Sequence, residues 1–370
     1  MSDDQKNLFM AMGLSLLVII GWQCFYAVPK MEQAKQQQSQ SEASSQLPKP
    51  GAPAPTGGQP TAPVAGQAPT APSTAAGNAP SVSQPSAPVP SAIVDRKQAI
   101  AATSRVTIDT PALAGSINLT SGRIDDISLK KYKETIKKDS EIVHLLSPPG
   151  TANPFYIETG FVAQDASLKL PKPDSKWTAD SSTLTPARPV TLSWDNGAGL
   201  VFKRTISVDG QYLFTIKNSV ENKSGKPVTL FPYSLVARTG KPVTAGFYVL
   251  HEGLVGVVGN SKVQEITYDG MAKETNSTRV LKGTGGWLGI TDKYWAVAAI
   301  PPQDEEFQGR FWASAGARKT YQSDVLGKAI MIAPNATGAT THEIFAGAKE
   351  TQIIDSYQEK YKIKNFDLLI

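Results

Sequence analysis

The side chains best suited to proton transfer are three histidines, two of which stand directly beside a glutamate. They are His144, His251 and His342, and the pairs are His251-Glu252 and His342-Glu343. An imidazole next to a carboxylate has the composition of an acid–base couple. Both pairs fall in strand-like segments, however, and neighbouring residues of a strand point to opposite faces. Neither pair therefore converges on one substrate, and we predict no catalytic residue and no enzyme.

Other chemistries lack their motifs. The sequence has no GxGxxG after a strand, no GxxxxGK[ST], no HExxH and no GxSxG, which leaves nucleotide binding and hydrolysis without support. The only cysteine, Cys24, lies in an apolar run, which excludes disulfide frameworks and thiolate metal clusters. The net charge of +5 is small and dispersed. We predict no cofactor, no metal and no nucleic-acid partner.

One lysine-rich stretch could contact anions. Lysines occupy positions 130, 131, 133, 137 and 138, interrupted by Glu134 and Asp139. Lysines commonly blunt the exposed edge of a sheet, and a basic cluster can also bind anionic lipid headgroups. We interpret the stretch as a solvated strand edge, with lipid contact as the alternative.

The most distinctive segment is GTGGWLGITDKYWAVAAIPP, residues 283–302. Its paired glycines permit close approach of two backbones, and Thr291-Asp292-Lys293 has the composition of a turn. We predict a tight bend between two buried strands. The alternative is a groove for a ligand or partner, contacted through Trp287, Asp292, Lys293 and Trp295.

The elements that must position these residues are strands. After Ser91, alternating apolar runs recur between turns rich in Gly, Pro, Asn and Asp. Alternation on both sides of Asp209-Gly210 predicts a hairpin with a type I′ turn. More than a dozen such strands without long intervening helices predict an all-β fold of two large, packed antiparallel sheets. One helix is expected over about 349–362, because four side chains share a face there: Ile353, Ile354, Tyr357 and Tyr361.

The N-terminal quarter cannot join this core. Residues 8–28 are apolar, and as a helix they would extend roughly 31 Å, enough to cross a bilayer. Asp3 and Asp4 at the start argue against a cleaved signal peptide. Twelve prolines lie between Pro48 and Pro90, and no aromatic residue occurs between Ala27 and Lys131. The predicted organisation is a transmembrane anchor (1–30), a disordered linker (31–92), a β-sandwich (93–348) and a C-terminal helix (349–370).

Several segments together resemble the N-terminal part of a YidC-type membrane protein insertase of Gram-negative bacteria. They are DQKNLFMAMGLSLLVIIGWQ, GSINLTSGRIDDISLKKYKET, GFYVLHEGLVGVVG, GGWLGITDKYWAVAAIP, IFAGAKE and YKIKNFDLLI. They follow the family's order and cover nearly the whole chain, and GGWLGITDKYW is the most specific of them.

This resemblance implies a periplasmic, mutarotase-like β-supersandwich behind a first helix that enters the inner membrane from the cytoplasm. Lysines alone weakly favour the reverse orientation, since two follow the span and one precedes it. The resemblance also implies insertion, folding and assembly of nascent inner-membrane proteins, alone or with the Sec translocon and its accessory subunits. The terminal helix would lead to a further span, because the family's insertase helix bundle is absent from this chain.

Two other functions remain open at this point. A membrane-anchored envelope module could bind a carbohydrate or a peptide in its sandwich, since nothing in the charge or motif pattern excludes it. A sugar-epimerase-like enzyme is disfavoured, because no His/Glu pair converges.

Overall fold

The computed structural model describes residues 93–242, 250–315 and 318–370. The predicted anchor (1–30) and linker (31–92) lie outside the described residues. Among the helices that are described, none is long and apolar enough to cross a membrane.

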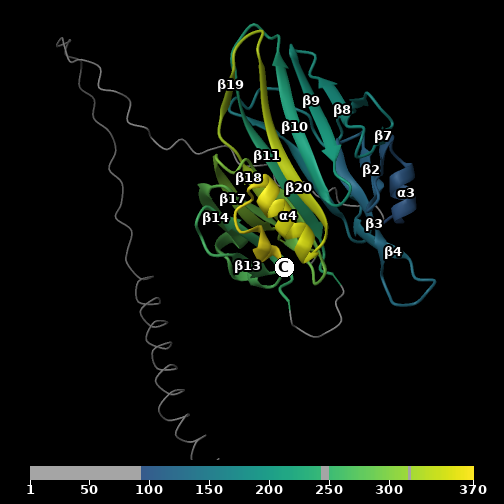
Figure 1. Cartoon of the computed structure of the whole chain (residues 1–370). Coiled ribbons are helices and arrows are strands. Elements are labelled where there is room, and N and C mark those ends of the chain that lie inside the picture. Colours follow the sequence, from purple (N-terminus) through teal and green to yellow (C-terminus); the bar gives the residue numbers. More distant parts are fainter. Residues whose placement is uncertain (1–92, 243–249, 316–317) are drawn as a thin grey trace, which may run out of the picture. The chain divides into compact units, whose positions relative to one another are not determined.

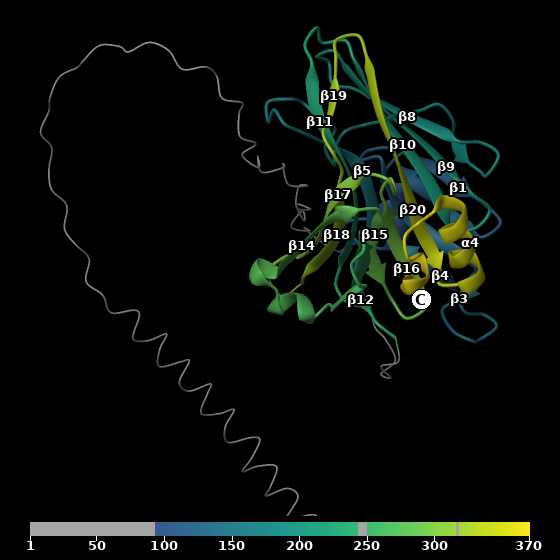
Figure 2. The ribbon, with the colours of Figure 1, turned by 60° about the vertical axis from the view of Figure 1, so that its left-hand side comes forward.

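Strands build most of the described body, and they form two large sheets (Figures 1 and 2). Sheet A has eleven strands: β1 (Arg105–Asp109), β2 (Leu113–Asn118), β3 (Arg123–Lys133), β4 (Ile142–Leu146), β5 (Phe155–Ala163), β7 (Thr183–Leu184), β11 (Val228–Thr239), β14 (Thr278–Thr284), β17 (Glu306–Ala313), β18 (Thr320–Leu326) and β19 (Ile330–Ile332). Their order is β14-β17-β18-β11-β5-β3-β2-β1-β7, with β19 paired to β11 and β4 paired to β3.

Sheet B has nine strands: β6 (Thr178–Ala179), β8 (Val190–Asp195), β9 (Leu200–Val208), β10 (Leu213–Asn222), β12 (Gly253–Val258), β13 (Gln264–Thr267), β15 (Gly286–Thr291), β16 (Trp295–Ile300) and β20 (Thr337–Ala348). Their order is β13-β12-β15-β16-β20-β10-β9-β8-β6. Pairing is antiparallel throughout both sheets except between β1 and β7. The predicted all-β fold with two large packed sheets is confirmed.

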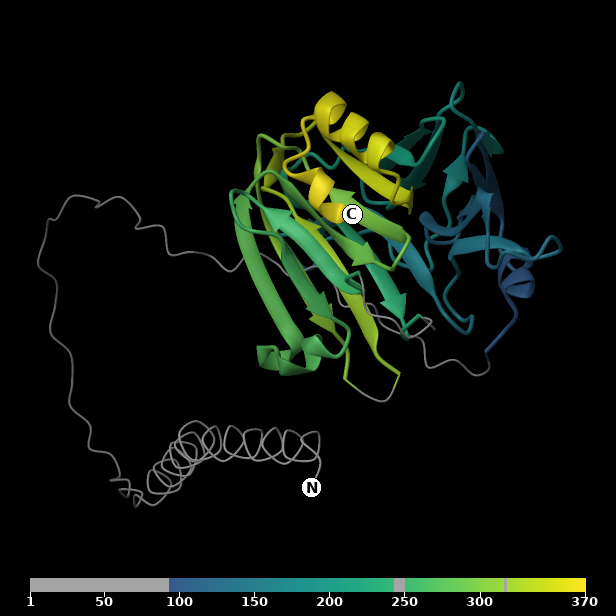
Figure 3. The same cartoon turned by 60° about the horizontal axis from the view of Figure 1, so that its bottom comes forward.

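Helices are short: α3 (Arg96–Ala101), α4 (Thr351–Tyr361), and the 3₁₀ turns η2 (Gly270–Lys273), η3 (Thr275–Ser277) and η4 (Phe366–Leu369). The predicted C-terminal helix is confirmed as α4, which lies over sheet B (Figure 3). Its buried Tyr357 packs edge-on against Phe345 of β20, with ring centroids 6.2 Å apart. Phe366 of η4 packs against the same ring at 5.7 Å.

One hydrophobic core joins the two sheets and this C-terminal cover, and its buried members run from Val106 to Leu369. Alternation supplies the core face: in β9, every second residue from Leu200 to Val208 is buried. All residues of β15 are buried, because sheet A packs near one face and η4 near the other. Residues 93–370 therefore contain a complete core of their own.

The hairpin predicted around Asp209-Gly210 is confirmed, but its predicted turn type is wrong. Val208 of β9 pairs with Phe214 of β10. A type I′ turn needs positive φ at both central residues, and neither Asp209 nor Gly210 has it. The Asp209 carboxylate instead accepts hydrogen bonds from the amides of Gln211 (2.8 Å) and Leu213 (3.1 Å), which stabilises a longer loop.

The three histidines lie on different elements, and none is hydrogen-bonded to a carboxylate in the described part of the chain. Nδ1 of His144 lies 2.8 Å from Oγ of Ser128, and Nε2 of His251 lies 3.0 Å from the Leu254 carbonyl oxygen. His342 is fully buried on β20, with Nδ1 3.1 Å from Oγ of Ser234 on β11. His342 thus joins the two sheets by a neutral contact.

Burial of His342 predicts a loss of stability in acid. Desolvation lowers its pKa to about 4, whereas the unfolded chain titrates near 6.5, so between these values the unfolded state binds more protons. Protonation of His342 in the unfolded state should therefore lower the free energy of unfolding by about 2–3 kcal/mol when the pH falls from 7.5 to 4.5. Urea denaturation of residues 93–370 at both pH values measures this loss, which should be absent from His342→Gln.

The comparison of the two proteins isolates His342 from other buried groups. Burial raises the pKa of Asp125 and of Asp324, which acts in the opposite direction on stability as the pH falls. Both carboxyl groups are present in wild type and in His342→Gln, so their contribution cancels. Equal acid losses in the two proteins would contradict a neutral buried His342.

Candidate functional site

The bend predicted within residues 283–302 is confirmed as the β15–β16 turn. Thr291 pairs with Ala296, and the Asp292 amide donates to the Trp295 carbonyl at 2.8 Å. Gly286 starts β15 with φ of +125°, and a Cβ there would lie 2.0 Å from the Val257 carbonyl oxygen. Only glycine therefore allows β12 to pair at this point.

The turn forms one wall of a groove of about 980 Å³. Asp292, Lys293 and Trp295, three of the four predicted contact residues, line it. The other lining residues come from distant parts of the chain: Arg96 before β1, Tyr132 and Lys133 of β3, His144 of β4, Arg238 of β11, Lys349 and Glu350 before α4, and the terminal Ile370.

Trp287, the fourth predicted residue, does not line this groove. Its side chain is fully buried, and its indole N–H is shared between the carbonyls of Lys364 (3.2 Å) and Asn365 (3.3 Å). Its ring also packs edge-on against Phe366, with centroids 5.5 Å apart. The structure places Trp287 in the core, where it holds the C-terminal segment.

Aromatic rings and one carboxylate organise the inner side of the groove. Tyr132 packs edge-on against Trp295 at 5.0 Å between centroids. The hydroxyls of Tyr132 and Tyr212 both donate to Oε1 of Glu350, at 2.9 and 2.7 Å. Burial and this carboxylate raise the pKa of both phenols, so they remain neutral donors.

The groove also contains a nearly buried ion pair between the two sheets. Nη1 of Arg238 donates to both oxygens of Asp292, at 2.7 and 2.6 Å, and the guanidinium stacks on Phe155. Burial lowers the pKa of Arg238, but Asp292 more than compensates and the net shift is upward. Asp292 is therefore engaged in fixing the turn against sheet A.

Further charges at the groove are mainly basic: Arg96, Lys133, Lys241, Lys293 and Lys349, against one further carboxylate, Glu134. Burial lowers the pKa of Lys349, which marks it as a poorly hydrated cation. The two carboxylates Asp292 and Glu350 already accept from other groups. The groove therefore favours anionic or aromatic contacts, and among its described lining residues no base is aligned with a nucleophile.

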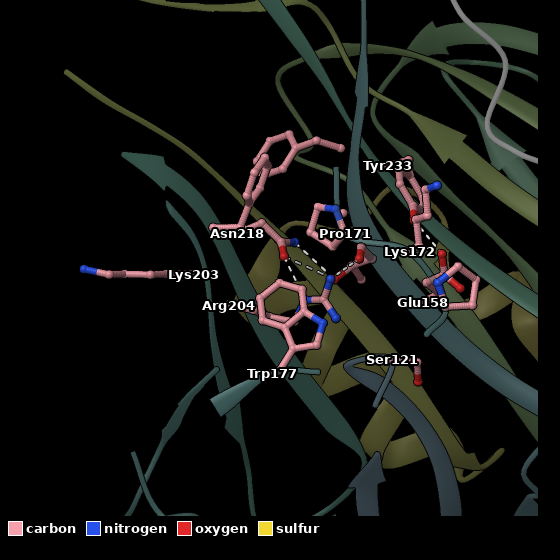
Figure 4. A pocket seen from close by; sticks show the side chains of 14 residues that line it. Ser121, Glu158, Pro171, Lys172, Trp177, Lys203, Arg204, Asn218 and Tyr233 are labelled. Atoms are coloured by element: carbon pink, nitrogen blue, oxygen red, sulfur yellow. Dashed lines mark hydrogen bonds between the residues drawn. The ribbon is translucent and has the colours of Figure 1, made fainter. Parts of the chain in front are cut away.

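A second, much smaller cavity of about 20 Å³ surrounds Arg204 of β9 (Figure 4). The buried guanidinium donates to Asn218 Oδ1 at 3.0 Å and to the carbonyls of Gly122 and Thr159, and it stacks on Trp177. The space admits about one water molecule. Arg204 thus fixes sheet B against sheet A, and this cavity is too small for a sugar ring.

Within the described ranges, no group of three or more His, Cys, Asp or Glu side chains is placed to hold a metal ion. The groove residues that sequence reasoning missed are Tyr132, Arg238 and Glu350. No sequence motif near these three residues identifies them as groove residues. They are far from the β15–β16 turn in the sequence, and only the packing of the two sheets and of α4 brings them to the same groove.

Comparison with known proteins gives one family and several close relatives. Residues 105–370 match the family model of the YidC periplasmic domain. Over its whole length the chain is 50% identical to "Membrane protein insertase YidC" of Beijerinckia indica and 48% identical to that of Methylobacterium radiotolerans. The chain spans 58% and 59% of the lengths of these two relatives.

Solved structures show a weaker likeness. The chain is similar to a galactose mutarotase related enzyme from Lactobacillus acidophilus, with a TM-score of 0.46 and 10% sequence identity, over 65% of this chain and 97% of the other. A likeness of this size carries no argument about activity. The family match is much more extensive than this structural likeness, since it covers every strand of both sheets. It shows that this chain belongs to the YidC family and carries its periplasmic domain.

Proposed function

We propose that the chain is the N-terminal part of a membrane protein insertase, which inserts, folds and assembles inner-membrane proteins alone or with the Sec translocon. The observation that carries this proposal is the 43–50% identity to proteins named as insertases along the entire chain. The alignments with these relatives cover the whole chain, including the residues before 93.

The proposed organisation follows from the sequence. Residues 1–30 anchor the chain with its N-terminus in the cytoplasm, residues 31–92 are a linker, residues 93–348 form the periplasmic sandwich, and residues 349–370 lead to a further span. The chain then supplies the tether and the outer body. Moving a charge to the bilayer centre costs about 3 kcal/mol on insertion scales, and in this proposal lowering that cost belongs to the part of the insertases that this chain does not span.

In this proposal the groove is a contact surface and has no catalytic role. Asp292, Lys293 and Trp295 present a turn that is held rigid by Arg238 and Tyr132. The engaged carboxylates and the histidines without carboxylate partners support a function without acid–base chemistry.

Depletion of the full-length protein from its bacterium tests the proposed function. Protease protection of a small inner-membrane protein should drop several-fold on depletion and return when the wild-type gene is supplied. Export of a soluble periplasmic protein serves as the control for general damage to the envelope. Unchanged membrane insertion after complete depletion would contradict the proposal.

A charge reversal tests the contact surface within the same assay. Lys293 lies at the turn and lines the groove, so Lys293→Glu in the full-length protein should lower insertion several-fold while protein levels remain unchanged. Lys328→Glu, an exposed lysine outside this groove, is the matched control. Equal insertion by the two variants would argue against the groove as a functional contact.

A further inference from the structure

We infer that one end of the domain, formed by the β3–β4 loop and the β15–β16 turn, contacts a membrane surface through anionic phospholipid headgroups. We call this end the lysine-rich end. The inference rests on the proposed function, which places the domain beside the inner membrane.

The β3–β4 loop projects from the body (Figure 1). Ile136 lies in this loop, between the end of β3 and the start of β4. Ile136 is 106% exposed, as open to water as a side chain in an extended peptide. The neighbouring Lys137 and Lys138 are also exposed, and neither ammonium group is hydrogen-bonded within the described residues. A bulky apolar side chain followed directly by two exposed lysines is a composition found in segments that enter a lipid–water interface.

The other exposed apolar residues of this end surround the same groove. Thr135, next to Ile136, lines the groove together with Leu250 and Tyr294. These two larger side chains are 43% and 56% exposed. Single exposed apolar residues are common on protein surfaces, but here two line one opening and a third, Ile136, follows a residue that lines it.

The strand-edge interpretation accounts for the lysines of β3 but not for those of the loop. β2 pairs with β3 only as far as Leu129, so Lys130, Lys131 and Lys133 lie where β3 has outrun its pairing with β2. Lys137 and Lys138 lie beyond the end of β3. Lipid contact, the alternative interpretation of the same stretch, fits the position of these two lysines in the projecting loop.

The shape of this end favours a deformable partner over a folded protein. Stable protein interfaces need a complementary, contiguous surface of roughly 800 Å² on each partner. Here an open groove lies beside the apolar side chains, and Lys133 and Lys293 line it. Lys137 and Lys138 follow in the same loop, next to the exposed carboxylates of Glu134 and Asp139. Headgroups can fill such gaps, and each lysine near an anionic surface contributes about 1 kcal/mol, or about fivefold in binding.

A fluorescent probe at position 136 tests this contact in the whole chain. Cys24 is the only cysteine, so Cys24→Ser combined with Ile136→Cys gives one labelling site for an environment-sensitive dye. Met331 is 76% exposed on β19, at the opposite end of the domain in both side views (Figures 1 and 2), and Met331→Cys in the same background is the matched control. Both proteins are reconstituted in phosphatidylcholine vesicles with and without about 30% phosphatidylglycerol.

We expect the dye at position 136 to shift to the blue and to be quenched by lipid-attached quenchers in the anionic vesicles only. The dye at position 331 should report water in both vesicles. Lys137→Gln with Lys138→Gln should lower the bound-to-free ratio at position 136 by about 25-fold. Lys226→Gln with Lys328→Gln, two exposed lysines near β19, should leave this ratio unchanged.

A water-like dye at position 136 in anionic vesicles would overturn the inference, as would equal immersion in both kinds of vesicle. Immersion that appeared only after Sec components were added would also overturn it, since the partner would then be a protein. The dye measurements need no insertion substrate. Flotation of the same samples shows separately whether the N-terminal anchor attaches the chain to the vesicles. A water-like dye on a floating chain, together with the loss of insertion on depletion of the full-length protein, would therefore reject the membrane contact and leave the proposed function intact.

Discussion

Replacement of Trp287 by alanine is expected to lower the unfolding free energy of residues 93–370 by about 3–5 kcal/mol. The side chain is fully buried, and it is among the largest of the core. Its removal leaves a cavity beside Phe366 and takes the shared indole donor from the Lys364 and Asn365 carbonyls. Urea denaturation followed by far-ultraviolet circular dichroism measures the loss.

Trp287→Phe separates the ring from its hydrogen bonds. Phenylalanine keeps much of the packing against Phe366 but donates nothing, so we expect a smaller loss of about 1–2 kcal/mol. Both variants should also be cleaved faster by protease after α4, because Trp287 holds the segment that follows this helix. Wild-type stability in Trp287→Ala would contradict the assignment of Trp287 to the core.

Replacement of Arg204 by methionine is expected to cost about 3 kcal/mol. The guanidinium is buried, and its hydrogen bonds reach neutral acceptors on both sheets: the carbonyls of Gly122 and Thr159 and the side chain of Asn218. Methionine fills similar space but cannot donate hydrogen bonds to these acceptors. Each buried acceptor that is left without a hydrogen bond destabilises the fold by about 1–3 kcal/mol. Part of this cost is offset because a charge is no longer buried; burial lowers the pKa of Arg204.

Lys203→Met is the matched control for this variant. Lys203 is the preceding residue on β9, its side chain is 40% exposed, and it pairs with Glu221 on the surface. Exposed pairs contribute at most about 1 kcal/mol. Denaturation midpoints of the two variants should therefore differ clearly, and similar midpoints would contradict a role for Arg204 in joining the sheets.

Local sequence patterns are sufficient to predict the strands. They do not predict features that depend on side-chain contacts or on the pairing of distant segments, such as the turn type and the strand order. The alternation in residues 200–220 predicts β9 and β10 correctly, because period-two burial is a property of each strand alone. The turn between them was predicted wrongly, since the Asp209 side chain binds two amides of the loop. Strand order has no local signal, because it depends on how non-adjacent segments pair.

The candidate site shows the same division. The segment around Asp292 and Lys293 predicts a turn by its composition, and the groove lies there. The local pattern does not show that Trp287 is a core residue while Trp295 lines the groove. Trp287 is buried because the C-terminal segment, about 80 residues later in the chain, covers its side of β15. Arg238 lies 54 residues before Asp292, and no motif connects the two.

The central claim is that residues 93–370 lie in the periplasm beside the inner membrane, and accessibility of a single cysteine tests it most directly. Full-length protein that carries Met331→Cys, with Cys24 and every other native cysteine replaced by serine, is expressed in its bacterium, and the outer membrane is permeabilised. Met331 is exposed, so a maleimide that cannot cross the inner membrane should label the protein in intact spheroplasts as fully as after lysis. Labelling that appeared only after lysis would place the domain in the cytoplasm and contradict the account.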